Sequence, residues 1–181
     1  MKNLSNILIC FIFLACFHSL QAQTIDKLDQ KNGFKDISFG ANIAEFSHKF
    51  QLTKDGGNDG YSIYESTSYD KIGFIDISKV SLLVYKNRVH EVRITTALEN
   101  YDDVMIVLKK AYGEPPEEAC QELENSEEKI IRYCVWNGSI AMLWCTYFES
   151  PEDKQVTIGI KNKALVKQMR NELEARAVDD L

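Results

Sequence analysis

The chain is poor in the residues and motifs that usually mark an active site. It has only three histidines among 181 residues, and neither His48 nor His90 lies in an H-E-x-x-H or comparable pattern. It also lacks the G-x-S-x-G turn of serine hydrolases, and its glycines match neither a phosphate-binding loop nor a dinucleotide fingerprint. We therefore assign no catalytic, cofactor-binding or metal-binding residue, and we expect His48 and His90 at the surface or its rim.

The chain also lacks an excess of positive charge. It carries 27 acidic and 21 basic residues, a formal net charge of −6. Non-specific binding to nucleic acid or to anionic lipid needs clustered Lys and Arg, so the composition argues against both partners. Hydrophobic residues at 45% and charged residues at 27% are typical of a globular protein, and the length suits one domain.

The only long apolar run lies at the N-terminus, from Ile7 to Phe17. It is shorter than the roughly 20 residues that a membrane-spanning helix needs. Because Lys2 precedes it and Leu20-Gln21-Ala22 follows, residues 1–22 are predicted to be a secretory signal peptide. The mature domain is then 23–181, periplasmic or secreted, with no transmembrane span. Alternatively, Phe13-Leu14-Ala15-Cys16 resembles a lipobox, which would tether the protein through a lipidated Cys16.

Cysteine spacing gives one structural prediction. Cys10 and Cys16 lie in the signal peptide, and no C-x-x-C pair indicates a thioredoxin-like or zinc site. An exported protein favours a disulfide. Cys134 and Cys145 share a face of a predicted hairpin but are four positions out of register. We therefore expect a disulfide between Cys120 and Cys134, which leaves Cys145 free.

Hydrophobic periodicity predicts an α+β fold. Helices are expected over 42–50, 101–112 and 163–177, and strands over 33–40, 61–66, 72–77, 80–86, 89–96, 130–136, 139–148 and 156–161. The order predicts an antiparallel sheet of about six to seven strands, with helices packed on one face. It also allows two halves, each a helix followed by a meander.

Two hairpins decide which side chains face the core. An Asn87-Arg88 turn would pair Lys86 with Val89, bury the Leu83 face and place His90 at the tip opposite Tyr85. An Asn137-Gly138 turn would pair Trp136 with Ser139. The more apolar face of this second hairpin is predicted as core: Ile131, Tyr133, Val135, Ile140, Met142, Trp144 and Phe148.

The opposite face of the second hairpin yields a candidate recognition patch. It carries Arg132, Trp136 and Leu143, and exposed Trp and Arg are typical anchors of protein interfaces. The alternative is that this face forms a second buried layer under a helix.

Several motifs together resemble a family. Gly33-Phe34 leading to Gly40 and a short helix, Val84-Tyr85 with Val89–Ile94, and Tyr112-Gly113-Glu114-Pro115 before a Trp-bearing strand resemble a loose group of small exported bacterial proteins of unassigned function. These are similar to the helix-on-sheet domains used as envelope-assembly components and protein inhibitors. The resemblance implies a helix-on-antiparallel-sheet fold and carries over no catalytic residue.

Two polar segments have both a structural and a functional interpretation. Asp55 to Gly60 faintly resembles a calcium loop, but an EF-hand would need a bidentate Glu where Ser66 stands, so a simple turn is the default. The acidic run from Glu114 to Glu128 is either a solvated loop or a docking surface for a basic partner.

The function expected from the sequence is therefore non-enzymatic. We expect an exported domain that binds a macromolecule of the cell envelope, in assembly, maintenance or inhibition. A carboxylate- or calcium-dependent hydrolase is the first alternative, and a small-molecule or lipid carrier the second.

Overall fold

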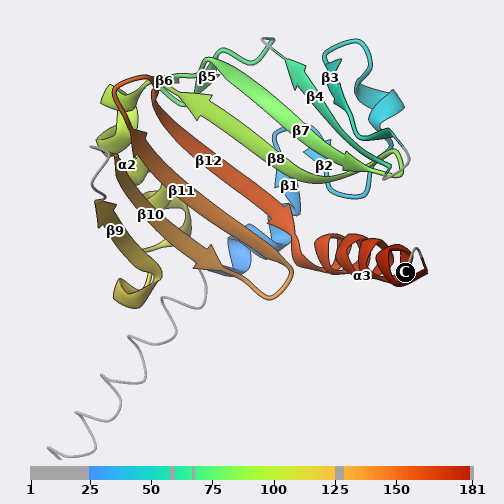
Figure 1. Cartoon of the computed structure of the whole chain (residues 1–181). Coiled ribbons are helices and arrows are strands. Elements are labelled where there is room, and N and C mark those ends of the chain that lie inside the picture. The colour runs from blue at the N-terminus through green and yellow to red at the C-terminus, as the bar shows by residue number, and fades with distance from the viewer. Residues whose placement is uncertain (1–24, 58–59, 67, 125–128, 180–181) are drawn as a thin grey trace, which may run out of the picture.

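The computed structural model describes residues 25–57, 60–66, 68–124 and 129–179. The predicted signal peptide and Cys16 lie outside this range. The domain is α+β, built on an eight-stranded antiparallel sheet in the order β3-β4-β7-β8-β12-β11-β10-β9 (Figure 1). Its strands are β3 (Gln51–Asp55), β4 (Tyr61–Ser66), β7 (Lys79–Tyr85), β8 (Arg88–Thr96), β9 (Cys120–Glu124), β10 (Ile130–Asn137), β11 (Ala141–Glu149) and β12 (Lys154–Asn162).

The remaining elements are short or helical. Residues 25–31 form a helical segment, and the two helices that follow the strands are α2 (Tyr101–Tyr112) and α3 (Lys163–Asp179). Two small ribbons pair β1 (Gly33–Phe34) with β2 (Ile37–Ser38) and β5 (Lys71–Ile72) with β6 (Ile75–Asp76). Single 3-10 turns are η1 (Ile43–Phe46), η3 (Leu98–Asn100) and η4 (Glu117–Ala119).

The sheet consists of two meanders joined through their last strands. β3, β4, β7 and β8 form one, β9 to β12 form the other, and β8 pairs antiparallel with β12. The predicted fold class is confirmed, but the sheet has eight strands because both edge strands were missed. β3 lies partly in a segment expected to be a turn, and β9 lies in the acidic run expected to be a loop.

Helix α2 has the predicted ends and the predicted apolar stripe. Asp102 and Asp103 lie in its first turn and Lys109 and Lys110 in its last, which suits the helix dipole. Gly113 follows at φ 82°, a left-handed conformation that favours glycine. Asn100 precedes the helix, but its side chain donates to the carbonyl of Asp76 and to Thr96 instead of capping α2.

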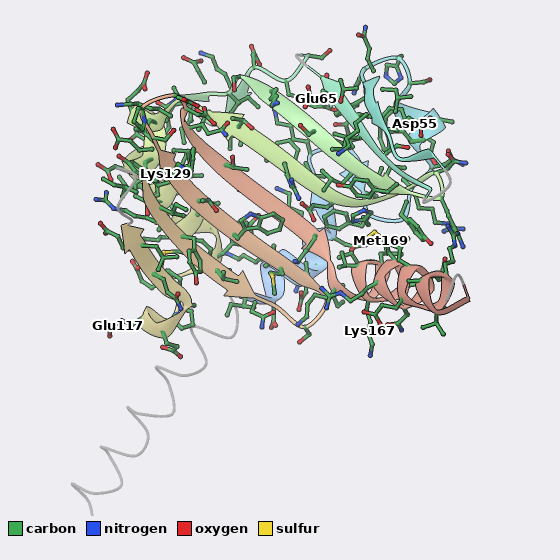
Figure 2. All side chains as sticks on the ribbon, in the orientation of Figure 1. Asp55, Glu65, Glu117, Lys129, Lys167 and Met169 are labelled. Atoms are coloured by element: carbon green, nitrogen blue, oxygen red, sulfur yellow. A yellow bond between two sulfur atoms is a disulfide. The ribbon has the colours of Figure 1, made fainter. Side chains whose placement is uncertain are left out.

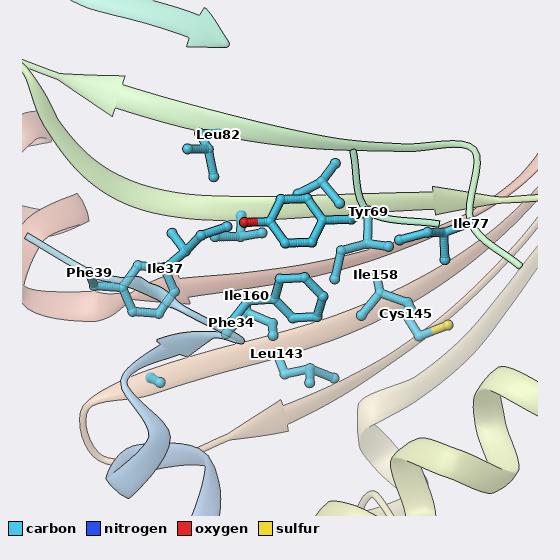
Figure 3. Packing of buried hydrophobic residues seen from close by; sticks show 14 of the residues in the cluster. Phe34, Ile37, Phe39, Tyr69, Ile77, Leu82, Leu143, Cys145, Ile158 and Ile160 are labelled. Carbon is cyan, nitrogen blue, oxygen red and sulfur yellow. The ribbon is translucent and has the colours of Figure 1, made fainter. Parts of the chain in front are cut away.

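The core lies between the sheet and a layer formed by α2 and the N-terminal segment (Figure 3). Ile94, Leu143, Ile158 and Ile160 point from the sheet toward Val104, Leu108 and Tyr112 of α2. Phe34, Ile37 and Phe39 cover the neighbouring part of the sheet. The predicted capping box of Asn42 and Glu45 is present, although the turn that it begins ends at Phe46.

The β10–β11 hairpin differs from its prediction in register and in buried face. Trp136 pairs with Leu143 and Asn137 with Met142, so the partner of Trp136 lies four residues further along the chain than predicted. The N–H of Gly138 donates to the carbonyl of Ala141 at 2.9 Å, which moves the turn from Asn137-Gly138 to Ser139-Ile140. Asp29 explains the shifted turn, because its carboxylate accepts hydrogen bonds from the backbone N–H groups of Ser139, Ile140 and Ala141 at 2.7, 2.9 and 2.8 Å. The shift is an even number of residues, so the two predicted sets of side chains still share faces. The face predicted as core is nevertheless the one turned away from α2.

The β7–β8 hairpin also differs from its prediction. Lys86 and Asn87 form the turn with φ of 47° and 64°, values typical of a type I′ turn, and Tyr85 pairs with Arg88. The register shifts between Leu83, which pairs with Glu91, and Val84, which pairs with Val89. His90 is therefore the extra residue of a β-bulge.

Candidate functional site

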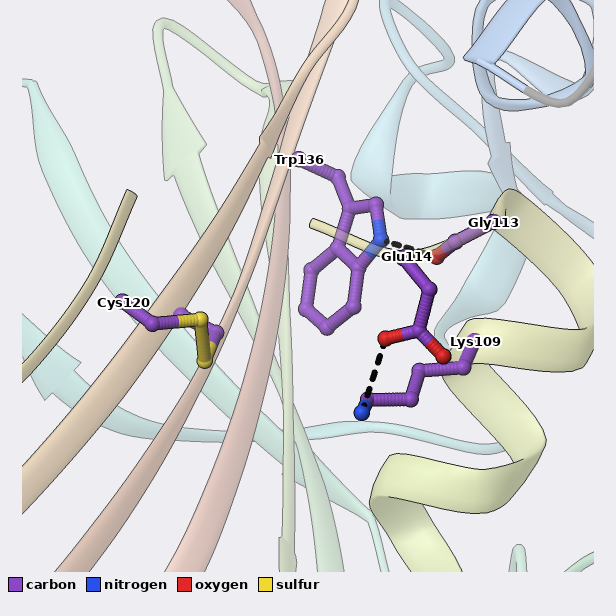
Figure 4. The surroundings of a disulfide bond; sticks show 6 residues. Lys109, Gly113, Glu114, Cys120 and Trp136 are labelled. Atoms are coloured by element: carbon purple, nitrogen blue, oxygen red, sulfur yellow. Dashed lines mark hydrogen bonds and ion pairs between the residues drawn. A yellow bond between two sulfur atoms is a disulfide. The ribbon is translucent and has the colours of Figure 1, made fainter. Parts of the chain in front are cut away.

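Two of the three residues of the predicted recognition patch are buried, which contradicts its assignment as an exposed surface; the Arg132 side chain is 40% exposed. Trp136 and Leu143 are each 0% exposed. The indole N–H of Trp136 donates to the carbonyl of Gly113 at 2.8 Å, just beyond the end of α2 (Figure 4). Arg132 lies on the same face near the sheet end, paired with Glu122 at 2.9 Å and stacked 4.9 Å from the ring centre of Tyr147. The alternative interpretation, a buried layer under a helix, is the one that the structure adopts.

The predicted disulfide between Cys120 and Cys134 is present (Figure 4). It joins the edge strand β9 to β10, where the two cysteines are direct cross-strand partners. Cys145 is a buried free thiol, as expected. The predicted register of Cys145 was wrong, because Cys134 also pairs directly with Cys145 across β10 and β11.

The structure instead exposes the other face of the sheet. We call it the open face: the side chains of β3–β4 and β7–β12 that alternate with the buried ones and point away from α2. In Figure 1 it is turned toward the viewer, and within the described residues no layer of secondary structure lies over its β9–β12 half. Its apolar members are Leu123, Ile131, Tyr133, Val135, Met142, Trp144 and Phe148; Leu123 is 54% exposed and the others are half-buried.

Trp144 is the centre of the open face. Its indole lies directly on the backbone of Gly159 in the neighbouring strand, since a Cβ at that position would come within 1.9 Å of the ring. The ammonium of Lys161 lies 5.3 Å from the ring centre, in cation–π contact. Glycine at position 159 thus makes a slot for the ring, and the slot fixes a large aromatic side chain flat on the sheet.

Cations gather beside Trp144 in an otherwise acidic protein. Arg93 follows Gly159 in the same cross-strand row and pairs with Glu91. Lys161 makes no ion pair within the described residues, because its cross-strand neighbour Glu91 pairs with Arg93 instead. Burial, together with the positive charges of Arg93 and Lys161, lowers the pKa of the neighbouring His90 to about 4.

His90 lies at the corner of the open face near α3. It is 3% exposed, not at the surface as expected, and its ring faces Tyr61 at 6.1 Å between centres. Neither ring nitrogen has a hydrogen-bond partner within the described part of the chain. It lines a cavity of about 80 Å³ together with Tyr85, Lys86, Arg88, Leu165 and Gln168. The bulge explains why no sequence pattern revealed this environment.

Helix α3 borders the open face at this corner. Tyr85 donates to the carboxylate of Glu172 at 2.8 Å, and Lys86 also pairs with it. Hydrogen bonds from Lys86, Gln168 and Tyr85 lower the pKa of Glu172 to about 2. Figure 2 shows Met169 on the side of α3 that faces the sheet. The open face therefore has a floor of strands and a helix at one end.

A polar groove at the β3–β4 edge is the nearest approach to a hydrolase site. It measures about 470 Å³ and contains His48, Glu65 and the hydroxyls of Ser47, Thr53, Ser66, Ser68 and Ser78. Within the described residues, no hydrogen bond joins His48 to a serine, and Glu65 pairs with Lys79 at 3.1 Å. Nucleophile activation needs a base within hydrogen-bond reach, so the groove shows no assembled catalytic pair.

The predicted turn at Asp55 is formed by the side chain itself. The Asp55 carboxylate accepts a hydrogen bond from the N–H of Gly57 at 3.0 Å, as in an Asx turn. Asn58 and Asp59 lie outside the described residues, so the calcium interpretation stays untested. Among the residues described, no group of three or more His, Cys, Asp or Glu converges on a metal position.

The acidic run is partly ordered into β9. Glu114 pairs with Lys109 at 2.8 Å (Figure 4). Glu122 pairs with Arg132, so two carboxylates of the run are neutralised within the domain. Residues 125–128 lie outside the described range.

An apolar cavity under α2 measures about 130 Å³, smaller than the several hundred Å³ that a carrier needs.

Comparisons with protein-family models, curated proteins and solved structures find no match to this chain. In the described part of the chain, no helix combines the length and apolar character needed to cross a bilayer. The candidate functional site is therefore the open face.

Proposed function

We propose that the protein is an exported, non-enzymatic domain that docks a protein partner on its open face. The observation that carries the proposal is Trp144, held flat on Gly159 at the centre of a half-buried apolar surface. Contiguous apolar surface of this kind on a soluble domain is typical of interfaces, and Trp is the residue most enriched among binding hot spots. The signal-like N-terminus and the disulfide support export.

The charged residues of the open face indicate what kind of surface the partner presents. Lys161 beside Trp144 makes no ion pair within the described residues, and Lys161, Arg93 and Glu91 together carry a net positive charge in a chain of net charge −6. The surface that meets the open face therefore carries apolar side chains over Trp144 and carboxylates toward Lys161. Such complementarity raises the association rate and makes binding salt-dependent.

Site-specific photo-crosslinking tests the proposal. A photoreactive residue replaces Met142 on the open face, or Ile106 on the outer surface of α2, which is 59% exposed and is the control. In an extract of the producing cell envelope, Met142 yields one discrete protein adduct and Ile106 yields none. Equal adducts from both positions, or none from Met142, would overturn the proposal.

Substitutions then locate the contact with the captured partner. Trp144→Ala weakens binding at least tenfold, whereas Phe74→Ala, which removes an aromatic ring that is 64% exposed elsewhere, leaves binding unchanged. Lys161→Glu slows association, and the effect shrinks at high salt. Circular dichroism confirms that each variant is folded.

A further inference from the structure

We propose that Cys120, Cys134 and Cys145 form an exchange unit, in which the disulfide moves from Cys120–Cys134 to Cys134–Cys145 and releases Cys120 as a thiol modification site at the sheet edge. The proposal does not depend on the docking surface. It rests on the register of three adjacent strands, β9, β10 and β11.

The three cysteines occupy one row across these strands. Cys134 pairs with Cys120 on one side and with Cys145 on the other. The Cα atoms of Cys120 and Cys134 are 4.1 Å apart, which identifies them as a non-hydrogen-bonded antiparallel pair. The backbone polar groups of Cys134 then point to β11, so Cys134 and Cys145 form a hydrogen-bonded pair with Cα atoms about 5.5 Å apart.

Both separations allow a disulfide. Bridged cysteines usually have Cα atoms within about 4.4–6.8 Å, with the commonest value near 5.5 Å. The pair that is currently bridged, at 4.1 Å, lies just below that range, and the Cys134–Cys145 pair lies near its mode. Cys134 is therefore within bridging reach of both neighbours.

The row also provides the approach that exchange requires. A thiolate attacks a disulfide sulfur opposite the leaving sulfur. Because strands are about 4.8 Å apart along the hydrogen-bonding direction, Cys145 approaches the Cys134 sulfur from the side opposite Cys120. The Cys134–Cys145 bond forms as the Cys120–Cys134 bond breaks, and the electron pair leaves on the Cys120 sulfur. Cys120 takes up a proton in place of the one that Cys145 lost, so no oxidant or reductant is consumed.

The free thiol is more accessible to solvent after exchange than before it. Cys145 is 0% exposed and Cys134 is 6% exposed, whereas Cys120 is half-buried on an edge strand. Exchange therefore places the free thiol where soluble electrophiles can reach it, and it removes the covalent tie between β9 and β10. Burial raises the pKa of the Cys145 thiol to about 12, which keeps exchange slow at neutral pH.

Trypsin separates the two pairings cleanly. Cys120 lies in the peptide 111–129, whereas Cys134 and Cys145 lie together in the peptide 133–154. The folded protein is incubated with N-ethylmaleimide at pH 7 and 8.5, then digested without reduction. The resting pairing gives the two peptides cross-linked. Exchange gives 111–129 with a labelled Cys120 and 133–154 with an internal disulfide.

The expected kinetics follow from the thiolate fraction of Cys145. Labelling of Cys120 is independent of the maleimide concentration and is about 30-fold faster at pH 8.5 than at pH 7, because the thiolate fraction rises tenfold per pH unit. Labelling of Cys145 with the cross-linked peptides intact would overturn the proposal. No labelling over several days at pH 8.5 would overturn it too.

Two variants separate exchange from other routes. Cys145→Ala removes the attacking thiol and abolishes labelling of Cys120; persistent labelling in this variant would contradict the mechanism. Cys120→Ser leaves only the second pair in the mature domain, and oxidised glutathione should convert it to the Cys134–Cys145 disulfide. If this variant folds by near-ultraviolet circular dichroism and its thiols remain unpaired, the geometry is wrong.

Discussion

At the scale of single residues, His90 combines burial with unsatisfied ring nitrogens. An unpaired buried polar group costs free energy, and protonating it among cations costs more. The groups around it are Tyr61 on β4, Tyr85 on β7, Lys86 in the β7–β8 turn, Arg88, Glu91 and Arg93 on β8, Lys161 on β12, and Gln168 and Glu172 on α3. Each element that meets at this corner therefore contributes a polar or charged group.

His90 should make the domain acid-sensitive. Its pKa is lowered to about 4 in the folded state, against about 6.5 when unfolded, so the unfolded chain binds the proton more tightly. The contribution of neutral His90 to the unfolding free energy is fully present above about pH 6.5 and is lost as the pH falls toward 4. Between pH 7.5 and 5 we expect a loss of about 2 kcal/mol in unfolding free energy from this residue.

Urea unfolding of His90→Phe at both pH values checks this expectation. The variant keeps a ring in the bulge and removes the titrating group. Between the two pH values its unfolding free energy should therefore fall by about 2 kcal/mol less than that of the unsubstituted protein. His48→Gln changes an exposed histidine and serves as the control. An unchanged pH dependence in His90→Phe would contradict the assignment.

At the scale of elements, the β10–β11 hairpin shows how a distant side chain sets a register. Asn137-Gly138 is a strong signal for a two-residue turn, yet the turn lies at Ser139-Ile140, where Asp29 accepts three backbone hydrogen bonds. Burial raises the pKa of Asp29, but these bonds and Lys163 outweigh it and leave the pKa below its usual value. The ionised carboxylate is thus part of the hairpin.

Asp29→Ala should therefore destabilise the domain. Removing a charged acceptor from three N–H groups costs about 2 kcal/mol, and urea unfolding at pH 7 measures it. Asp26→Ala on the same helical segment changes an exposed carboxylate and should cost little. A loss in Asp26→Ala as large as that in Asp29→Ala would instead implicate helix propensity or net charge.

At the scale of the whole molecule, the two meanders are rigid and α3 is loosely attached. Central strands β8 and β12 are buried on the face toward α2 and hydrogen-bonded on both sides. Leu165, Val166, Met169 and Leu173 of α3 are only half-buried, and Glu172 is its main link to the β7–β8 hairpin. Few buried contacts mean a low free energy of local opening.

Hydrogen exchange followed by mass spectrometry should show this difference. Amides of α3 should exchange much faster than those of α2, β8 and β12. Glu172→Gln weakens the link and should accelerate exchange in α3 alone, while Glu174→Gln, an exposed neighbour, should not. Protection of α3 equal to that of α2 would show that the helix is held more firmly than its contacts indicate.

The sequence by itself determined the local features of this protein. The stripe and ends of α2, the Asn42–Glu45 capping box and the antiparallel α+β class all follow from short-range patterns. These features are decided by neighbouring residues, so they are readable without knowledge of the rest of the chain.

Only the tertiary structure decided which face of the sheet is buried. Both faces of β10 and β11 are apolar, and alternation alone cannot say which one α2 covers. Trp136 is buried because its indole N–H reaches the carbonyl of Gly113, and Trp144 is left on the open face because Gly159 makes room for it there. The bulge at His90 and the carboxylate of Asp29 shift both hairpins through contacts that no local pattern encodes. The candidate site therefore emerged from residues that the sequence had assigned to the core.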